Sequence, residues 1–182
     1  MGKALGMAEF KTVSAGVKAA DAMVKTAEVS IIEATTVCPG KYIVILSGDL
    51  SAVNAAVETA KTAHGTHLID SFVLGNRHES IFPAIYGAAQ IEEVAALGVL
   101  ETYDAAAIIV AADQAAKTAD VDLIELRLAR GMCGKSYMFL TGDVAAVEAA
   151  ISRARTTVGE TGMYLDSTVI PRPDQQIRER IL

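Results

Sequence analysis

The chain has 182 residues, of which 52% are hydrophobic, and it carries a formal net charge of −6 with a pI of about 5.1. This acidic balance argues against a nucleic-acid partner, which needs a basic face to release counterions from phosphates, and against an anionic membrane surface. The longest strongly apolar stretch, residues 105–112, is far shorter than the ~20 residues that cross a bilayer. The start of the chain lacks the continuous apolar segment of a signal peptide, so we expect a cytoplasmic protein.

The first half of the chain predicts the element order strand, helix, strand, strand, helix, strand. Apolar residues at helical spacing indicate a first helix with one buried face. Two segments between the helices, 28–37 and 42–46, are rich in apolar residues and are of strand length. The turn Gly48-Asp49 provides an N-cap candidate for a second helix. The predicted buried positions are Val17, Ala20, Val24 and Ala27 in the first helix and Val53, Ala56, Val57 and Ala60 in the second.

The second half repeats the first, so the same six elements are expected again. The offset grows through two insertions of two residues, one before Gly134 and one after Gly159, where loops are expected. Matching pairs are Leu5-Gly6 with Leu97-Gly98 at an offset of 92, Gly40-Lys41 with Gly134-Lys135 at 94, and Asp70-Ser71 with Asp166-Ser167 at 96. The buried helix positions of the second copy are Ile109, Ala112, Ala116, Ala119, Val147, Ala150, Ile151 and Ala154, and its central strands are 121–128 and 137–140.

The repeat predicts an α+β fold of two tandem domains, residues 1–92 and 93–182, each a mainly antiparallel sheet with helices on one face. Both halves resemble the bacterial microcompartment (BMC) shell domain. The motifs that carry this resemblance are Gly6-Met7-Ala8-Glu9, Ala20-Asp21-Ala22-Met23-Val24-Lys25 and Gly48-Asp49. Two further segments are similar to the PduT-like class of tandem-domain shell proteins from propanediol-utilisation microcompartments: Val37-Cys38-Pro39-Gly40-Lys41 and Val169-Ile170-Pro171-Arg172-Pro173.

The resemblance implies a structural protein rather than an enzyme. It implies a flat homotrimer, a pseudohexamer whose six domains mimic a hexamer, within a microcompartment shell. Such tiles join other shell proteins edge to edge around encapsulated enzymes, so enclosed redox enzymes are candidate partners. In the PduT-like class a [4Fe–4S] cluster occupies the central opening, held by one cysteine from each chain, for electron transfer or cluster delivery across the shell.

Cys38 is the candidate metal ligand. It lies between two predicted strands, where Pro39 fixes its own φ and Gly40 permits a positive φ, so the loop is tight enough to project a thiol. A threefold axis turns one such thiol into three equivalent ligands. The resemblance assigns the cluster to this residue. The alternative is that Cys38 is a small apolar residue without a metal.

The second copy of this loop contains Met132, Cys133 and Gly134. By the offset of 94, Met132 aligns with Cys38 and Cys133 aligns with Pro39. The PduT-like pattern requires no cysteine at this position. Cys133 is therefore either an additional thiol or an alternative ligand at the central opening, or a loop cysteine without a metal.

Lys25 and Lys117 occupy equivalent positions at the ends of equivalent helices. The resemblance places these lysines at the tile edge, and it makes Arg77 and Arg172 the edge arginines. The alternative for the lysines is a helix C-terminal charge that the macrodipole favours, and both roles are compatible.

Other groups give weaker indications of chemistry. His64 and His67 have no third metal ligand near them in the sequence, and Glu9 and Glu101 are repeat equivalents that indicate a structural role. The chain has no Ser/His/Asp arrangement, Cys-x-x-Cys pair or glycine-rich phosphate loop. Two alternatives stay open: a shell tile whose central pore conducts metabolites without a cluster, and an enzyme or ligand-binding regulator on a duplicated ferredoxin-like fold.

Overall fold

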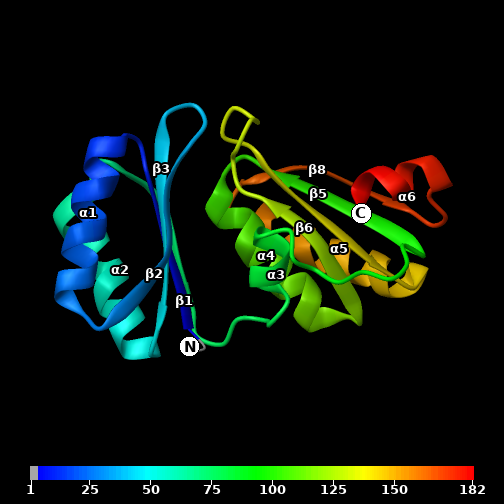
Figure 1. The fold of residues 1–182 in the computed structure, drawn as a ribbon, viewed down its shortest axis with the longest axis horizontal. Helices are drawn as coiled ribbons and strands as arrows, with labels where there is room; N and C mark the ends of the chain where they lie inside the picture. The colour runs from blue at the N-terminus through cyan, green and yellow to red at the C-terminus, as the bar shows by residue number, and fades with distance from the viewer. Residues whose placement is uncertain (1–3) are drawn as a thin grey trace. The chain divides into compact units, whose positions relative to one another are not determined.

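The computed structural model of the chain describes residues 4–182. The chain divides into two compact units, one ending at Arg77 and the other running from His78 to Leu182. Each unit contains a four-stranded antiparallel sheet with two long helices packed against it (Figure 1). The predicted α+β class and the predicted tandem repeat are thereby confirmed.

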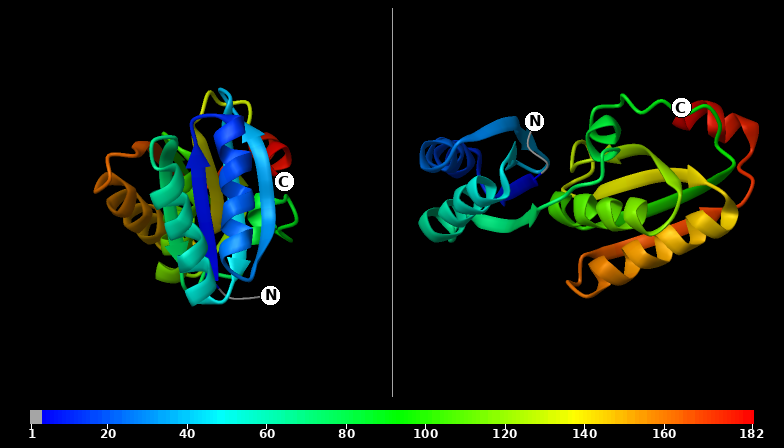
Figure 2. Two further views of the ribbon diagram at one scale, coloured as in Figure 1. Left: turned by 90° about the vertical axis from the view of Figure 1, so that its left-hand side faces the viewer. Right: turned by 90° about the horizontal axis from the view of Figure 1, so that it is seen from below.

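The first unit has the six predicted elements in the predicted order. They are β1 (Ala4–Phe10), α1 (Val13–Thr26), β2 (Val29–Val37), β3 (Lys41–Gly48), α2 (Leu50–His64) and β4 (Leu68–Leu74). The strand order across the sheet is β2-β3-β1-β4. The left view of Figure 2 shows α1 and α2 side by side over one face of this sheet.

The second unit repeats this arrangement. Its six elements are β5 (Ala96–Thr102), α4 (Ala105–Thr118), β6 (Val121–Arg127), β7 (Ser136–Gly142), α5 (Val144–Gly159) and β8 (Tyr164–Ile170). The strand order β6-β7-β5-β8 is that of the first unit. Equivalent residues also pair alike, because Gly6 lies opposite Leu46 and Gly98 lies opposite Leu140.

Two short helices were not predicted: α3 (Ile81–Ile85) and α6 (Gln175–Ile181). Ile81 and Ala84 of α3 are fully buried, and α3 packs against β6 and α4. Residues 78–95 therefore belong to the second compact unit, and the boundary predicted at residue 92 falls inside that unit. Helices of five and seven residues span too few turns to show an apolar period, so the pattern did not reveal them.

Helices α2 and α5 bury the predicted faces, with all eight side chains at 5% exposure or less. In α4, Ile109, Ala112 and Ala116 are buried as predicted. The prediction for α1 was partly wrong, because Val17 is 51% exposed and Val24 is 37% exposed.

Helix α1 instead turns a face of small residues toward the sheet: Gly16, Ala19, Ala20 and Met23 are buried. The reason is a close approach at Gly16, where an added Cβ would lie 2.5 Å from the Cβ of Tyr42 on β3. The Tyr42 side chain thus fixes which face of α1 meets the sheet, and it leaves the valines exposed beside that face.

Substitution at this contact should distinguish packing from helix propensity. We expect Gly16→Ala to destabilise the chain by about 1–2 kcal/mol, because overpacking against Tyr42 outweighs the gain in helix propensity. A Cβ added at Gly159 in α5 would meet no atom of residues 4–182 within 4 Å beyond its own stretch of helix, so Gly159→Ala should be neutral or stabilising by about 0.5 kcal/mol. Denaturant unfolding of both variants measures the difference, and equal midpoints would disprove the close approach.

None of the helices in the part of the chain that the structure describes is long and apolar enough to cross a membrane.

Candidate functional site

The candidate ligand Cys38 lies in the turn that joins β2 to β3. Its side chain is half-buried, whereas Pro39 and Gly40 are exposed. The Cys38–Pro39 peptide is cis, Gly40 has a φ of 106°, and its N–H donates to the carbonyl oxygen of Val37 at 2.9 Å. Cys38 thus lies in a tight turn at the tip of a two-stranded hairpin, between two strands that the sequence predicted.

The turn end of this hairpin is held by a buried ion pair. The Nζ of Lys41, the first residue of β3, lies 2.6 Å from the Oε1 of Glu9 on β1. The Glu9 side chain is fully buried and that of Lys41 is 17% exposed. Glu9 thus holds the start of β3, the strand that follows the Cys38 turn.

The corresponding turn of the second unit differs in shape. Cys133 is exposed with a φ of 53°, Gly134 is buried with a φ of 92°, and Met132 is half-buried. The N–H of Lys135 donates to the carbonyl oxygen of Met132 at 3.1 Å. Each hydrogen bond closes a four-residue turn, Val37 to Gly40 in the first unit and Met132 to Lys135 in the second. Cys38 and Cys133 are each the second residue of their turn. The strands that follow keep the predicted offset of 94, so the two turns are shifted by one residue against their strands.

The side chains that could act as metal ligands show whether this site suits an iron–sulfur cluster. In one copy of the chain, residues 4–182 contain no group of three His, Cys, Asp or Glu side chains placed to hold a metal ion. The Cys38 sulfur is nevertheless the ligand type that such clusters require. Cys38 fits a cluster in kind, and the further ligands that a cluster needs would have to come from other copies of the chain.

The predicted edge lysines both form ion pairs one helical turn apart. On α1, Lys25 Nζ lies 2.7 Å from Asp21 Oδ2, and the two side chains are 73% and 59% exposed. On α4, Lys117 Nζ lies 2.6 Å from Asp113 Oδ2, with 37% and 0% exposure. The role of the aspartates was not predicted, although an Asp four residues before a Lys in both copies is a recognisable signal.

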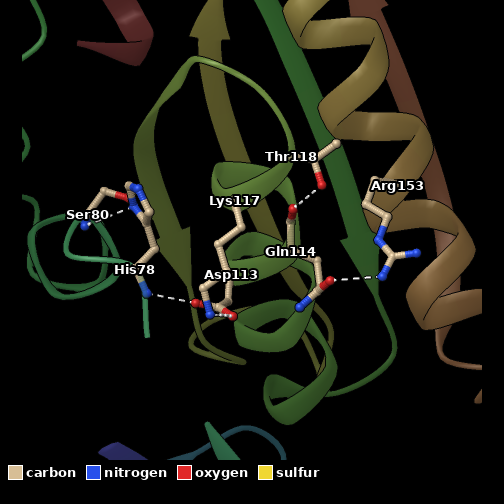
Figure 3. A network of polar contacts seen from close by, with 7 residues as sticks. All are labelled: His78, Ser80, Asp113, Gln114, Lys117, Thr118 and Arg153. Carbon is tan, nitrogen blue, oxygen red and sulfur yellow. Dashed lines mark hydrogen bonds and ion pairs between the residues drawn. The ribbon is translucent and has the colours of Figure 1, made fainter. Parts of the chain in front are cut away.

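Asp113 is the centre of a small polar network (Figure 3). Besides Lys117, it accepts a hydrogen bond from the backbone N–H of His78 at 2.7 Å. The His78 ring lies 2.7 Å from the hydroxyl of Ser80 through its Nδ1. This network ties the segment that follows β4 to the face of α4.

The two predicted edge arginines are not repeat equivalents. Leu5 pairs with Leu74 and Leu97 pairs with Ile170, so counting onward makes Asn76, not Arg77, the equivalent of Arg172. Arg172 is exposed, whereas Arg77 is half-buried and desolvation lowers the pKa of its guanidinium below the usual value.

The geometry of both units matches a known family. Residues 4–77 and 96–173 match the BMC domain, and together these ranges cover most of the chain. The chain belongs to the BMC domain family. The bacterial microcompartment shell protein PduT of Citrobacter freundii is 40% identical over 177 residues, which is 97% of this chain and 96% of that protein.

Other BMC proteins agree in sequence or in structure. A microcompartment protein from Desulfitobacterium hafniense DCB has a TM-score of 0.89 and 42% identity, covering 98% of this chain and 99% of that one. Carboxysome shell protein CsoS1 of Prochlorococcus marinus is 38% identical over 88 residues, which is 47% of this chain and 85% of CsoS1. The fused permuted hexameric shell protein of the RMM microcompartment shares the fold, with a TM-score of 0.65 at 21% identity over 86% of this chain and 81% of that one.

Proposed function

We propose that three copies of this microcompartment shell protein form one closed tile whose centre carries an iron–sulfur cluster. The shell role is carried by two BMC domains that span most of the chain and by the full-length similarity to PduT. The proposed role is structural and not catalytic. The proposed location is a microcompartment shell, with other shell proteins as edge-to-edge partners and enclosed redox enzymes as candidate contacts.

The trimer is supported by an apolar face of α1 that is exposed to solvent in a single chain. On α1, Val13, Val17 and Val24 are 39%, 51% and 37% exposed. Their repeat equivalents on α4 are Ala105, Ile109 and Ala116, which are all at 8% exposure or less. An exposed apolar stripe whose counterpart is buried indicates that another chain covers it. Two domains per chain close into a ring of six when three chains meet.

The oligomeric state is the first test. Light scattering at micromolar concentration should give three times the chain mass of 19.1 kDa. A monomer or a dimer would disprove the closed tile.

The proposed cluster rests on the Cys38 turn. Three thiols related by the threefold axis supply three equivalent sulfur ligands, which a [4Fe–4S] cluster accepts through three of its irons. When bound, such a cluster supplies one-electron redox chemistry. The chain would supply the thiolates, and the Glu9–Lys41 pair fixes the strand that follows the turn that bears them. A wild-type trimer that takes up no iron under anaerobic reconstitution would favour a metabolite-conducting pore instead.

The tile edge is the third feature of the proposal. Changing Lys25 and Lys117 together to Ala should weaken assembly into sheets. The Lys117 change should also destabilise the second unit, because it leaves the buried Asp113 carboxylate without its ion pair, so light scattering must first show that trimers are present. Each contact repeats at every tile boundary, so small losses accumulate across a sheet. Electron microscopy compares sheet formation with the wild type at equal protein concentration. Unchanged assembly would remove these lysines from the edge.

A further inference from the structure

The same carboxylate occupies two different environments in the two units. Asp113 is fully buried and uses both oxygens, one for Lys117 and one for the backbone N–H of His78. Its repeat equivalent, Asp21, is 59% exposed and pairs through Oδ2 with Lys25. What distinguishes the two sites is the backbone segment that covers Asp113.

That segment follows β4. The strand ends at Leu74, and His78, four residues later, donates its N–H to Asp113. Ile81, three residues further along, is fully buried where α3 packs against β6 and α4. The residues that leave β4 therefore dock on the first helix and first hairpin strand of the second unit.

The equivalent surface of the first unit, on α1 and β2, is exposed. On β2, Ile31 is 42% exposed, whereas its equivalent Leu123 on β6 is 1% exposed. The two are equivalent because Ile31 pairs with Leu46 and Leu123 pairs with Leu140. Asp21 and Ile31 thus form an open copy of the surface that is occupied in the second unit.

The segment equivalent to 75–81 follows β8. Ile170 is the counterpart of Leu74, so counting onward makes Asp174 the counterpart of His78 and Ile177 that of Ile81. Asp174 is exposed, and Ile177 is 47% exposed whereas Ile81 is fully buried. Among the described residues β8 is followed by α6 alone, so one copy has a docking segment and a docking surface that do not meet within a repeat.

We propose that residues 171–177 of one chain dock on α1 and β2 of a second copy, with the backbone N–H of Asp174 donating to the carboxylate of Asp21. This inference rests on the proposed trimer and names one contact that closes it. A hydrogen bond to a charged acceptor is among the stronger polar contacts in proteins. Lys25, paired with Asp21, offsets the added charge of the Asp174 side chain. In the closed ring the Asp21–Lys25 pair then acquires the surroundings that the Asp113–Lys117 pair already has.

Cross-linking between two singly substituted chains tests this contact. One chain carries Asp21→Cys and the other carries Asp174→Cys, both with Cys38→Ser and Cys133→Ser, and the two are coexpressed with different tags. A short bis-maleimide should join one chain of each kind. Because each chain has one thiol, no cross-link within a chain is possible. Both positions are exposed, so both variants should fold.

The matched control replaces Asp174→Cys by Glu160→Cys, a position at the end of α5 that is also exposed. This pair should give at least tenfold less covalent dimer, at a concentration where sheets do not form. Light scattering on the same samples separates the possible failures. A trimer that cross-links no better through Asp174→Cys than through the control overturns the docking contact and leaves the tile standing. A preparation without trimers overturns both.

Discussion

Replacing Cys38 by serine is expected to abolish iron binding while the trimer remains folded. Iron in these clusters prefers thiolate sulfur, and a serine hydroxyl is a harder and far less acidic ligand. The threefold axis multiplies the change, since one substitution removes all three equivalent ligands. The fold should tolerate it because Pro39, Gly40 and the hydrogen bond from Gly40 to Val37 shape the turn without the sulfur.

The measurement is iron and sulfide content, together with visible absorbance, after anaerobic reconstitution of trimers. Wild type should hold about four irons per trimer and Cys38→Ser close to none. Cys133→Ser is the matched control, and the resemblance to PduT-like proteins assigns it no ligand role. Iron that survives Cys38→Ser but is lost in Cys133→Ser would move the site to the other turn. That outcome has a structural basis, because Cys133 holds the same position within its hydrogen-bonded turn.

Lys41→Met is expected to cause a large loss of stability. Glu9 is fully buried, and its 2.6 Å ion pair with Lys41 compensates part of the cost of removing its charge from water. Removing one partner of a buried pair typically costs about 3 kcal/mol or more, because the remaining charge loses that compensation. Because Lys41 begins β3 directly after the Cys38 turn, the same change should loosen the hairpin that carries the thiol.

Guanidinium unfolding at neutral pH measures this loss. The control is Lys135→Met, at the repeat equivalent, since the structure shows no ion pair for Lys135 among residues 4–182. Its effect should stay within about 0.5 kcal/mol. If the two variants unfold at the same midpoint, the Glu9–Lys41 pair does not stabilise the first unit.

The sequence was sufficient for the architecture because the repeat presented each element twice. Helices α2 and α5 show the same apolar face, and both proved buried where expected. The buried face of α1 was misassigned because valine is more hydrophobic than glycine or alanine, so the apolar pattern favoured the valines as the buried positions. The contact between Gly16 and Tyr42, which turns the helix, depends on shape and not on polarity.

The candidate site was harder to predict than the fold. Position in a turn identified Cys38 as a thiol at a hairpin tip, but the ligand set belongs to an assembly and not to one chain. The role of the buried Asp113 was missed because it accepts a hydrogen bond from the backbone N–H of His78. Every residue except proline has such an N–H, so the identity of residue 78 does not predict the contact. Arg77 and Arg172 are 95 positions apart, so the repeat offset of 96 already separates them, and the strand registers agree that Asn76 is the counterpart of Arg172.

Joining two domains in one chain changes how the proposed tile responds to dilution. At equilibrium the amount of a ring of three chains varies with the cube of the free chain concentration, whereas a ring of six separate domains varies with the sixth power. Halving the free concentration lowers the first about eightfold and the second about sixty-fourfold. A tandem chain therefore keeps its tiles assembled over a wider range of expression levels than a single-domain relative with contacts of equal strength.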